Sequence, residues 1–243
     1  MLKIKHINES DFERIFVFGD LHGCLGLFDA MLEKINLTKN DLIVILGDSC
    51  DRGEDSIGLY LRYAELIAQG RQILHVRGNH EDMLYKAIFE DDAQSYYTWI
   101  NNGGEETIKS AKAHGFTDIP PAVKEFIEQM PHIISSEQSI FVHAAYNPKI
   151  SLERQDEDFV MWRRTPFWQE NDTGKKIYFG HTPNRDNEIH DKGNGVFAMD
   201  CGAVFFGRLV IMEIKSGEKF EVGLRRRKCL ILRRIYISDT QIL

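Results

Sequence analysis

The sequence predicts an α/β fold, and three observations support this prediction. Short apolar runs rich in β-branched residues recur along the 243-residue chain, and most of them end in polar residues. Helical patterns separate the first of these runs, at 25–35 and at 57–67. Hydrophobic residues make up 43% and charged residues 28% of the chain, which is typical of a globular domain that buries a core without crosslinks.

The first three apolar runs are predicted to be buried strands that deliver polar side chains at their carboxyl ends. They span 15–18, 42–46 and 73–76, and they end before Gly19-Asp20, Gly47-Asp48 and Arg77-Gly78-Asn79. Glycine at such a bend allows a strand to turn sharply into a helix with a ligand at the turn. We therefore expect these polar residues to meet at one edge of a sheet.

The rest of the chain is predicted to be a helical stretch followed by further strands. A mainly helical segment runs roughly from 80 to 130, interrupted by Asn101-Asn-Gly-Gly and by Pro120-Pro121. Strand-like runs return at 139–143, 176–181, 196–200 and 208–214. Between His143 and Lys176 the chain is rich in aromatic and charged residues with weak periodicity, and we expect a long functional loop there.

Charge and composition argue against several classes of protein. The formal net charge of −7 disfavours a surface whose main role is non-specific binding of nucleic acid. The first residues lack the apolar core of a secretory signal, and no later run approaches the length of a membrane span. The four cysteines are scattered without a CxxC pair, which suits a reducing compartment. We therefore expect a cytoplasmic protein without a membrane span.

Five predicted strand ends carry residues that can bind metal ions. Three of them lie in the first third of the chain and two lie later; the residues are Asp20, His22, Asp48, Asn79, His80, His143 and His181. Carboxylate, imidazole and amide oxygen together suit Mn, Fe or Zn, whereas a set of oxygen ligands alone would indicate Mg or Ca. One shared carboxylate, most plausibly Asp48, would bridge two ions.

These residues belong to an ordered set of motifs that spans residues 15 to about 214. The motifs are Gly19-Asp-Leu-His-Gly23, Gly47-Asp-Ser-Cys-Asp-Arg-Gly53, Arg77-Gly-Asn-His-Glu81, His143 after Ile-Phe-Val, Trp162-Arg-Arg164, Phe179-Gly-His-Thr182 and Asp200-Cys-Gly-Ala-Val-Phe205. An ordered set is a stronger signal than any single motif. The chain resembles the PPP family of metallophosphatases, and within it the small bacterial and bacteriophage lambda-type serine/threonine protein phosphatases.

The resemblance implies a metallophosphatase fold. In this fold a central β-sandwich of two mixed sheets is flanked by helices, and the active site lies at the carboxyl-terminal edge of the strands. Residues 1–223 would form the catalytic domain. Residues 224–243 would form a basic and apolar tail, for which we consider edge pairing or disorder first, and binding of an acidic partner or an anionic lipid second.

The resemblance also implies a role for each site residue and two divalent metal ions as cofactors. Manganese is the expected ion, with iron or zinc as alternatives. Asp20, His22 and Asp48 would hold one ion, and Asp48, Asn79, His143 and His181 would hold the other. His80 would be the general acid, oriented by Asp51, while Arg52 and Arg164 would grip the phosphate oxygens. The spacing Trp-x-Arg favours Arg164 over its neighbour Arg163.

The implied reaction is hydrolysis of a phosphate monoester by water. Two ions about 3.5–4 Å apart lower the pKa of a water molecule for attack on phosphorus. A general acid then protonates the serine or threonine oxygen that leaves. Neighbouring side chains at an extended strand end point in opposite directions, so we expect one of Asn79 and His80 to bind metal and the other to face the substrate. The resemblance implies that Asn79 is the one that binds metal.

Two features have both a functional and a structural interpretation. Cys50 is either an oxidation-sensitive residue near the metals or a small core residue, and the core interpretation is favoured because buried free cysteine is common. Five aromatic residues form either a wall for the substrate or local packing, with equal weight; they are Tyr146, Phe159, Trp162, Phe167 and Trp168.

The main prediction is therefore a serine/threonine protein phosphatase that acts on a phosphoprotein or phosphopeptide. A hydrolase of dinucleoside tetraphosphates with the same architecture is the alternative, although Asp51 and the Trp-x-Arg motif favour the protein phosphatase. A non-catalytic interaction module is less favoured, because every expected ligand position is filled.

Overall fold

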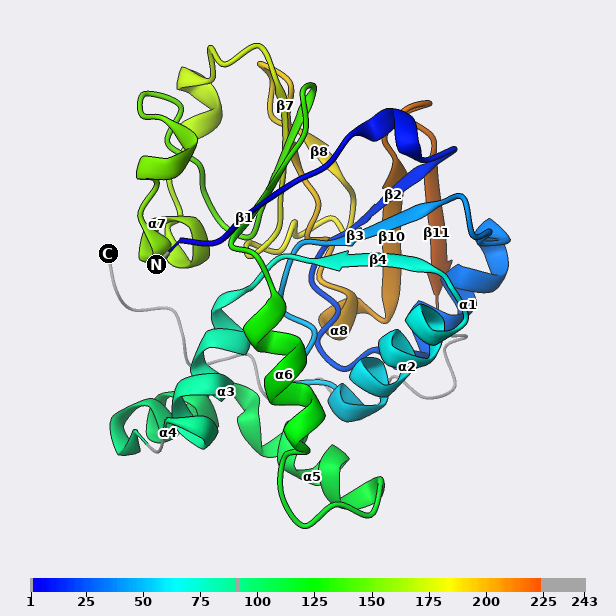
Figure 1. Ribbon diagram of the computed structural model, residues 1–243, viewed down its shortest axis with the longest axis vertical. Helices are drawn as coiled ribbons and strands as arrows, with labels where there is room; N and C mark the ends of the chain where they lie inside the picture. The colour runs from blue at the N-terminus through cyan, green and yellow to red at the C-terminus, as the bar shows by residue number, and fades with distance from the viewer. Residues whose placement is uncertain (1, 91, 224–243) are drawn as a thin grey trace.

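The computed structural model describes residues 2–90 and 92–223, which form two mixed sheets packed face to face with helices outside them (Figure 1). The first sheet has the order β11 (Lys219–Gly223), β10 (Arg208–Glu213), β2 (Ile15–Phe18), β3 (Leu42–Ile45), β4 (Gln72–His75). The second has the order β1 (Ile4–His6), β5 (Ile133–Ser135), β6 (Ser139–Val142), β7 (Lys176–Phe179), β9 (Val196–Ala198), β8 (His190–Asp191). The predicted α/β sandwich is confirmed.

Parallel pairing at the centre of each sheet brings the strand ends together. β2, β3 and β4 pair in parallel, as do β6, β7 and β9, whereas β10, β11, β5 and β8 add antiparallel pairs. The carboxyl ends of neighbouring parallel strands lie at the same edge of a sheet. The strand predicted at 15–18 ends at Phe18 as expected, whereas the other predicted strands end one or two residues earlier in the structure than in the sequence pattern.

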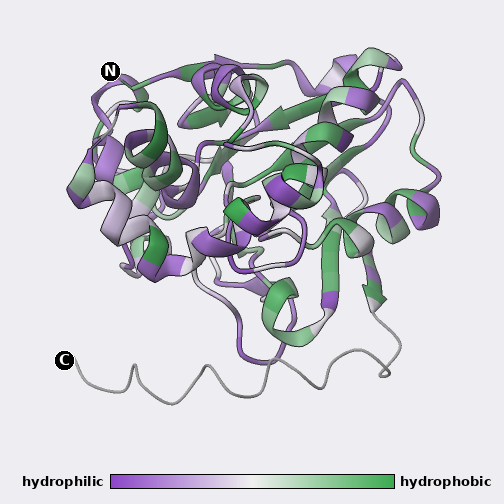
Figure 2. Cartoon of the chain, turned by 90° about the horizontal axis from the view of Figure 1, so that it is seen from below, coloured by the Kyte–Doolittle hydropathy of each residue, from purple (hydrophilic) through white to green (hydrophobic). Residues whose placement is uncertain are grey.

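Alternation along β2 shows how one strand serves two cores. Ile15 and Val17 pack between the two sheets, whereas Phe16 and Phe18 pack against the helices outside the first sheet. Those helices are α1 (Leu25–Ile35) and α2 (Ser56–Ala68), close to the predicted ranges. In Figure 2 the helices carry both hydrophobic and hydrophilic residues, as expected for helices that cover a sheet on one side and meet solvent on the other.

A helical insertion between β4 and β5 fills the range predicted to be helical. It consists of α3 (Asn79–Phe89), α4 (Ala93–Trp99), the π-helical turn η2 (Ile100–Gly104), α5 (Glu105–Ala113) and α6 (Pro121–Gln129). The interruption predicted at Asn101-Asn-Gly-Gly falls in η2, where Gly103 has φ +102°. Pro121 begins α6, where its fixed φ suits the first helical position.

The segment between His143 and Lys176 is not one long loop, and that prediction was wrong. It contains two 3₁₀ turns, η3 (Leu152–Arg154) and η4 (Phe167–Glu170), and the helix α7 (Glu157–Trp162). Val160, Met161 and Phe167 are buried here and form a third core with the outer face of the second sheet. Helical periodicity was weak because α7 has only 6 residues. Two further short elements, η1 (Glu9–Asp11) and α8 (Ala203–Phe206), were also not predicted.

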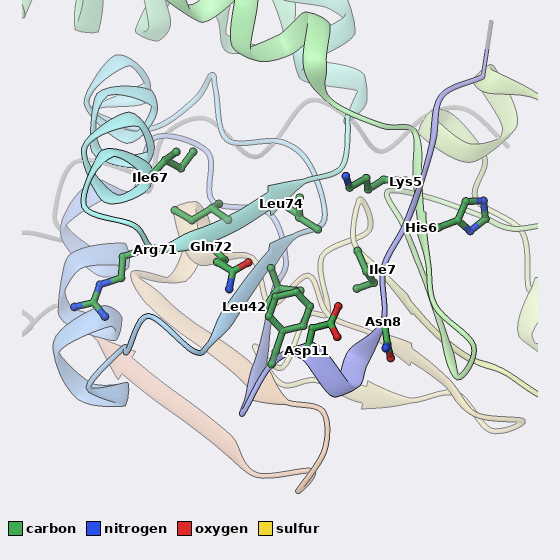
Figure 3. Close-up of a pocket in the computed structure, with 12 residues that line it drawn as sticks. Lys5, His6, Ile7, Asn8, Asp11, Leu42, Ile67, Arg71, Gln72 and Leu74 are labelled. Carbon is green, nitrogen blue, oxygen red and sulfur yellow. The ribbon is translucent and has the colours of Figure 1, made fainter.

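Three remaining features concern the surface and the ends. A cavity of about 520 Å³ opens between the outer strands β1 and β4 (Figure 3), and its lining includes Lys5, Arg71 and Ile67 but none of the candidate site residues. Within residues 2–90 and 92–223, no helix combines the length and the hydropathy that a membrane span requires. The predicted tail, 224–243, lies outside the described residues, so the domain boundary stays a prediction.

Candidate active site

The candidate ligands follow the carboxyl ends of five strands in both sheets. Asp20 and His22 follow β2, Asp48 follows β3, Asn79 and His80 begin α3 after β4, and His143 and His181 follow β6 and β7. All seven side chains are at most 6% exposed. The structure therefore collects residues from 20 to 181 at one buried place where the two sheets meet.

Asp48 lies at the centre of this constellation. Its Oδ2 is 3.4 Å from Nε2 of His143 and 3.7 Å from Nε2 of His22. Two groups of metal-ligand atoms share it: His22, Asp48 and His80 form one, and Asp48, His143 and His181 form the other, each with atoms within 4.8 Å of one another. This position suits a carboxylate that bridges two ions.

Hydrogen bonds to backbone carbonyls fix the orientation of three histidine rings. Nδ1 of His22 is 2.7 Å from the Cys50 carbonyl, and Nδ1 of His143 is 2.7 Å from the Leu46 carbonyl. A carbonyl only accepts, so Nδ1 donates in both rings and Nε2 is the nitrogen that faces Asp48. His181 is held in the opposite sense, because its Nε2 donates to the Trp162 carbonyl at 3.1 Å.

Burial keeps two of these imidazoles neutral. It lowers the pKa of His22 well below its ordinary value and lowers the pKa of His181 to about 2. The pKa of Asp48 behaves differently, since burial would raise it, but the facing His143 and His80 rings hold it well below its usual range. Neutral imidazole and ionised carboxylate are the forms that bind metal ions.

Buried negative charge around Asp48 also fits cations. Burial and the neighbouring carboxylates Asp200 and Asp48 raise the pKa of Asp20 well above its ordinary value, and burial raises the pKa of Asp200 to about 6. Oδ2 of Asp200 is buried without a hydrogen-bond partner in the part of the chain that the structure describes. Three carboxylates packed together in the interior are unfavourable unless cations compensate them. The donor set and its charge therefore fit two divalent ions.

Asp20 is the predicted ligand whose placement differs from the others. Its Oδ1 accepts a hydrogen bond from the backbone N–H of His181 at 3.0 Å, and Asp20 belongs to neither group of ligand atoms. His80 lies in the group with His22 and Asp48 instead, with Nε2 3.9 Å from Oδ2 of Asp48. The assignment of Asp20 as a ligand and of His80 as the acid stays a prediction.

Asn79 and His80 do not sit on an extended strand end, and that part of the geometric prediction was wrong. Both residues are in the first turn of α3, where consecutive side chains are about 100° apart around the axis. Oδ1 of Asn79 lies 2.9 Å from Nε2 of His143, whereas Nδ1 of His80 lies 2.7 Å from Oδ2 of Asp51. The helix start thus directs Asn79 toward His143 and His80 toward Asp51.

Two arginines lie beside the ligands. Nη1 of Arg52 donates to Nε2 of His22 at 2.7 Å, and its guanidinium lies 5.8 Å from the centre of the Phe205 ring. Arg164 donates to the His181 carbonyl at 3.4 Å and to Oγ1 of Thr182 at 3.2 Å. Both predicted phosphate-binding arginines therefore reach the same edge.

Glu81 is a buried residue beside the candidate site to which the sequence pattern assigned no role. It is 0% exposed, and its carboxylate accepts hydrogen bonds from the N–H groups of Asp48 (2.9 Å), Ser49 (2.7 Å) and Gly78 (3.0 Å) and from the Tyr60 hydroxyl (3.0 Å). It thus ties the turn after β3 to the start of α3. Its place in Gly-Asn-His-Glu was the only available signal.

The structure separates the alternatives for the aromatic residues and for Cys50. Tyr146 and Phe167 are buried in the third core, with Phe159 and Trp168 packed against it. Trp162, at 39% exposure, lies 6.5 Å from His181 and is the one of the five that faces the site. Cys50 is 0% exposed within the core, which supports its structural interpretation.

Comparisons with known proteins agree with this geometry. The family model described as calcineurin-like phosphoesterase matches residues 13–207. The chain is 29% identical over 224 residues to serine/threonine-protein phosphatase 1 of Salmonella typhimurium, covering 87% of this chain and 96% of that protein. It is 25% identical over 238 residues to the asymmetrical bis(5'-nucleosyl)-tetraphosphatase PrpE of Bacillus thuringiensis, covering 85% and 92%. A solved structure described as a candidate diadenosine tetraphosphatase superimposes on this chain with a TM-score of 0.71 at 21% identity. The match covers 93% of this chain and 100% of that chain.

Proposed function

The chain belongs to the calcineurin-like phosphoesterase family, and on that premise we propose that it is a serine/threonine protein phosphatase. As a metallophosphoesterase it hydrolyses phosphate esters; the choice of substrate is the step we propose. The observation that carries it is the buried pair His80–Asp51 beside the Asp48 constellation, with 2.7 Å between Nδ1 and Oδ2. A serine or threonine oxygen is a poor leaving group, so its departure needs a proton donor.

Six residues would hold the metal ions in this proposal. Asp20, His22 and Asp48 would bind one divalent ion, and Asp48, Asn79, His143 and His181 the other. When bound, the ions would supply Lewis-acid chemistry, with positive charge on phosphate oxygens and a lowered pKa for water. Mixed nitrogen and oxygen donors favour Mn²⁺, with Fe or Zn as alternatives.

The chain's own residues would perform the remaining steps. Asp51 accepts from Nδ1 of His80 and so directs Nε2 toward the leaving oxygen, which takes the proton when the P–O bond breaks. Arg52 and Arg164 would bind the phosphate oxygens, since a guanidinium matches two of them at once. The ligand side chains are buried, so bulk water does not compete with them for the metal ions.

Hydrolysis of dinucleoside tetraphosphates is the second candidate. It is favoured by the similarity to PrpE of Bacillus thuringiensis, at 25% identity over 238 residues. Its leaving group is a nucleotide phosphate, which departs without a strong proton donor. The buried His80–Asp51 pair is therefore better used on an alcohol. A phosphoprotein substrate and a cytoplasmic location complete the proposal, the latter because Cys24, Cys50 and Cys201 are free thiols.

The test compares substrates on protein of known metal content. The protein is stripped with chelator, metal removal is confirmed by elemental analysis, and Mn²⁺, Zn²⁺, Fe²⁺ or Mg²⁺ is added back. Turnover of phosphoserine, phosphothreonine and phosphotyrosine peptides is then compared with that of diadenosine tetraphosphate. We expect Mn²⁺ to restore the most activity and phosphoserine or phosphothreonine peptides to be preferred. A preference for diadenosine tetraphosphate, or full turnover in the stripped protein, would overturn the proposal.

A further inference from the structure

Both oxygens of the Asp51 carboxylate accept hydrogen bonds from helices of the insertion. Oδ2 takes the bond from His80, while Oδ1 accepts from Nε1 of Trp99 at 2.8 Å and from Oγ1 of Thr107 at 2.7 Å. Asp51, Trp99 and Thr107 are each 0% exposed. One oxygen therefore orients the histidine at the start of α3, and the other is fixed by α4 and α5 of the helical insertion.

The same insertion holds the backbone around Asp51 in an unusual conformation. Asp51 and Arg52 have φ values of 70° and 66°, a left-handed region that costs free energy in residues other than glycine. Thr107 Oγ1 accepts from the Asp51 N–H at 2.9 Å, and the Gly103 carbonyl accepts from the Arg52 N–H at 3.1 Å. Both strained residues are thus anchored to η2 and α5.

Two glycines in η2 permit this close approach. A Cβ atom on Gly104 would lie 2.5 Å from the ring of Trp99, and one on Gly103 would lie 2.8 Å from Cγ of Arg52. These separations are shorter than side chains tolerate. The sequence Asn-Asn-Gly-Gly therefore lets the insertion reach Asp51 and Arg52, in addition to interrupting the helices.

We propose that Trp99 and Thr107 are positioning residues that act through Asp51 on His80. They fix the rotation of the carboxylate, so that Nε2 of His80 stays aimed at the leaving oxygen. This inference rests on the proposed acid role of His80. Trp99 also packs in the core between the first sheet and the helices outside it. If packing were its only role, its replacement would lower the free energy of unfolding and reduce turnover of all substrates equally.

Conservative variants separate the two roles. Trp99→Phe keeps an aromatic ring without its N–H, Thr107→Val keeps the shape without the hydroxyl, and Thr107→Ser restores the donor. With metal content matched, we expect kcat for phenyl phosphate to fall roughly 10-fold in the first two, a size suited to one lost hydrogen bond to a charged group. Turnover of p-nitrophenyl phosphate, whose leaving group needs little protonation, should fall less than about threefold. Thr107→Ser, which keeps the hydroxyl donor, should have nearly the unsubstituted kcat for phenyl phosphate.

Trp168→Phe is the matched control. Trp168 stacks on Phe179 at 6.0 Å in the third core, away from Asp51, so its replacement should leave both rates unchanged. Equal losses on the two aryl phosphates in Trp99→Phe and Thr107→Val would overturn the proposal and leave packing as their role.

A double-mutant cycle tests the route through Asp51. In the Asp51→Asn background, Trp99→Phe should have little further effect on phenyl phosphate, because the carboxylate on which it acts is gone. Additive losses would show that Trp99 acts independently and would overturn the proposal. Both aryl phosphates are simple monoesters, so these rates can be measured in any phosphomonoesterase. Failure to cleave phosphopeptides would therefore count against the proposed function alone.

Discussion

At the scale of single residues, His80 lies where it could act either as the general acid or as a metal ligand. Its Nε2 lies near Asp48 in a group of metal-ligand atoms, while its Nδ1 is bonded to Asp51. An acid and a ligand would use the same Nε2 atom. The two roles therefore exclude each other and give opposite results on substitution.

His80→Asn should keep both metal ions and lose roughly 10²–10⁴-fold in turnover of phosphoserine peptides, the range for a lost general acid. The loss on p-nitrophenyl phosphate should be much smaller. Steady-state rates and elemental analysis of the same preparation check both points. Loss of an ion would make His80 a ligand, and equal losses on both substrates with the ions still bound would refute the acid role.

Glu81 gives a second prediction at this scale. Its carboxylate accepts four hydrogen bonds, and Glu81→Gln would point an NH₂ group at some of those donors. We expect the free energy of unfolding to fall by about 1–3 kcal/mol and metal affinity to fall roughly 10–100-fold. Urea unfolding of the metal-free protein and a metal titration measure the two effects. The exposed Glu125→Gln is the control, and equal behaviour of the two variants would contradict the role of Glu81.

At the scale of secondary-structure elements, the predictable parts are those with long apolar runs or clear helical periods. β2 and β3 are continuous apolar runs that are buried at every position, and the buried positions of α1 repeat at three to four residues. β1 and β8 have 3 and 2 residues with exposed positions, so their pairing is set by β5 and β9 rather than by their own pattern. The candidate ligands follow strands with apolar runs, so their meeting at one edge was predictable for the same reason as β2 and β3.

The residues that support the site were not predictable from spacing. Trp99 bonds to Asp51 across 48 positions, and Asp200 shares the interior with Asp20 although it follows β9 in the second sheet. Such contacts depend on how the insertion and the sheets pack. A local pattern marks a residue at a strand end, whereas a contact between distant elements leaves no spacing to detect.

The junction of β1 and β5 gives a prediction about pH. His132 precedes β5, and its Nδ1 accepts from the N–H of Lys3, which precedes β1, at 2.9 Å. Burial lowers the pKa of His132 to about 4. The neighbouring Glu157 and Asp82 act in the opposite direction and Arg77 in the same direction, so burial prevails. The folded protein therefore resists protonation here, while the unfolded chain takes up a proton near pH 6.5.

It follows that His132 lowers stability as the pH falls from about 6.5 to about 4, where the unfolded state binds more protons. His132→Asn keeps an acceptor for Lys3 and removes the titration. We expect the difference in the free energy of unfolding between pH 7 and pH 4.5 to be smaller in this variant, as measured by urea unfolding at both values. An unchanged difference would show that His132 is not the group responsible.

At the scale of the whole molecule, the two sheets depend on each other at the site. The first sheet supplies Asp20, His22 and Asp48 and leads into α3, while the second supplies His143 and His181. Core residues such as Val44 and Phe141 pack between the sheets and fix their distance. The family match, 13–207, includes all these elements. β10 and β11 follow it in the sequence and complete one edge of the first sheet.

This arrangement predicts that the catalytic unit ends with β11. β11 pairs with β10 from Lys219 to Gly223, and its Phe220 packs against Phe16 at 5.8 Å. A chain that ends at Gly223 should therefore match the full chain in metal content, melting temperature and turnover, although it lacks the six basic residues of 224–243. A chain that ends at Ser216 removes β11 and should melt earlier. Loss of metal from the folded 1–223 protein would show that the tail belongs to the catalytic domain.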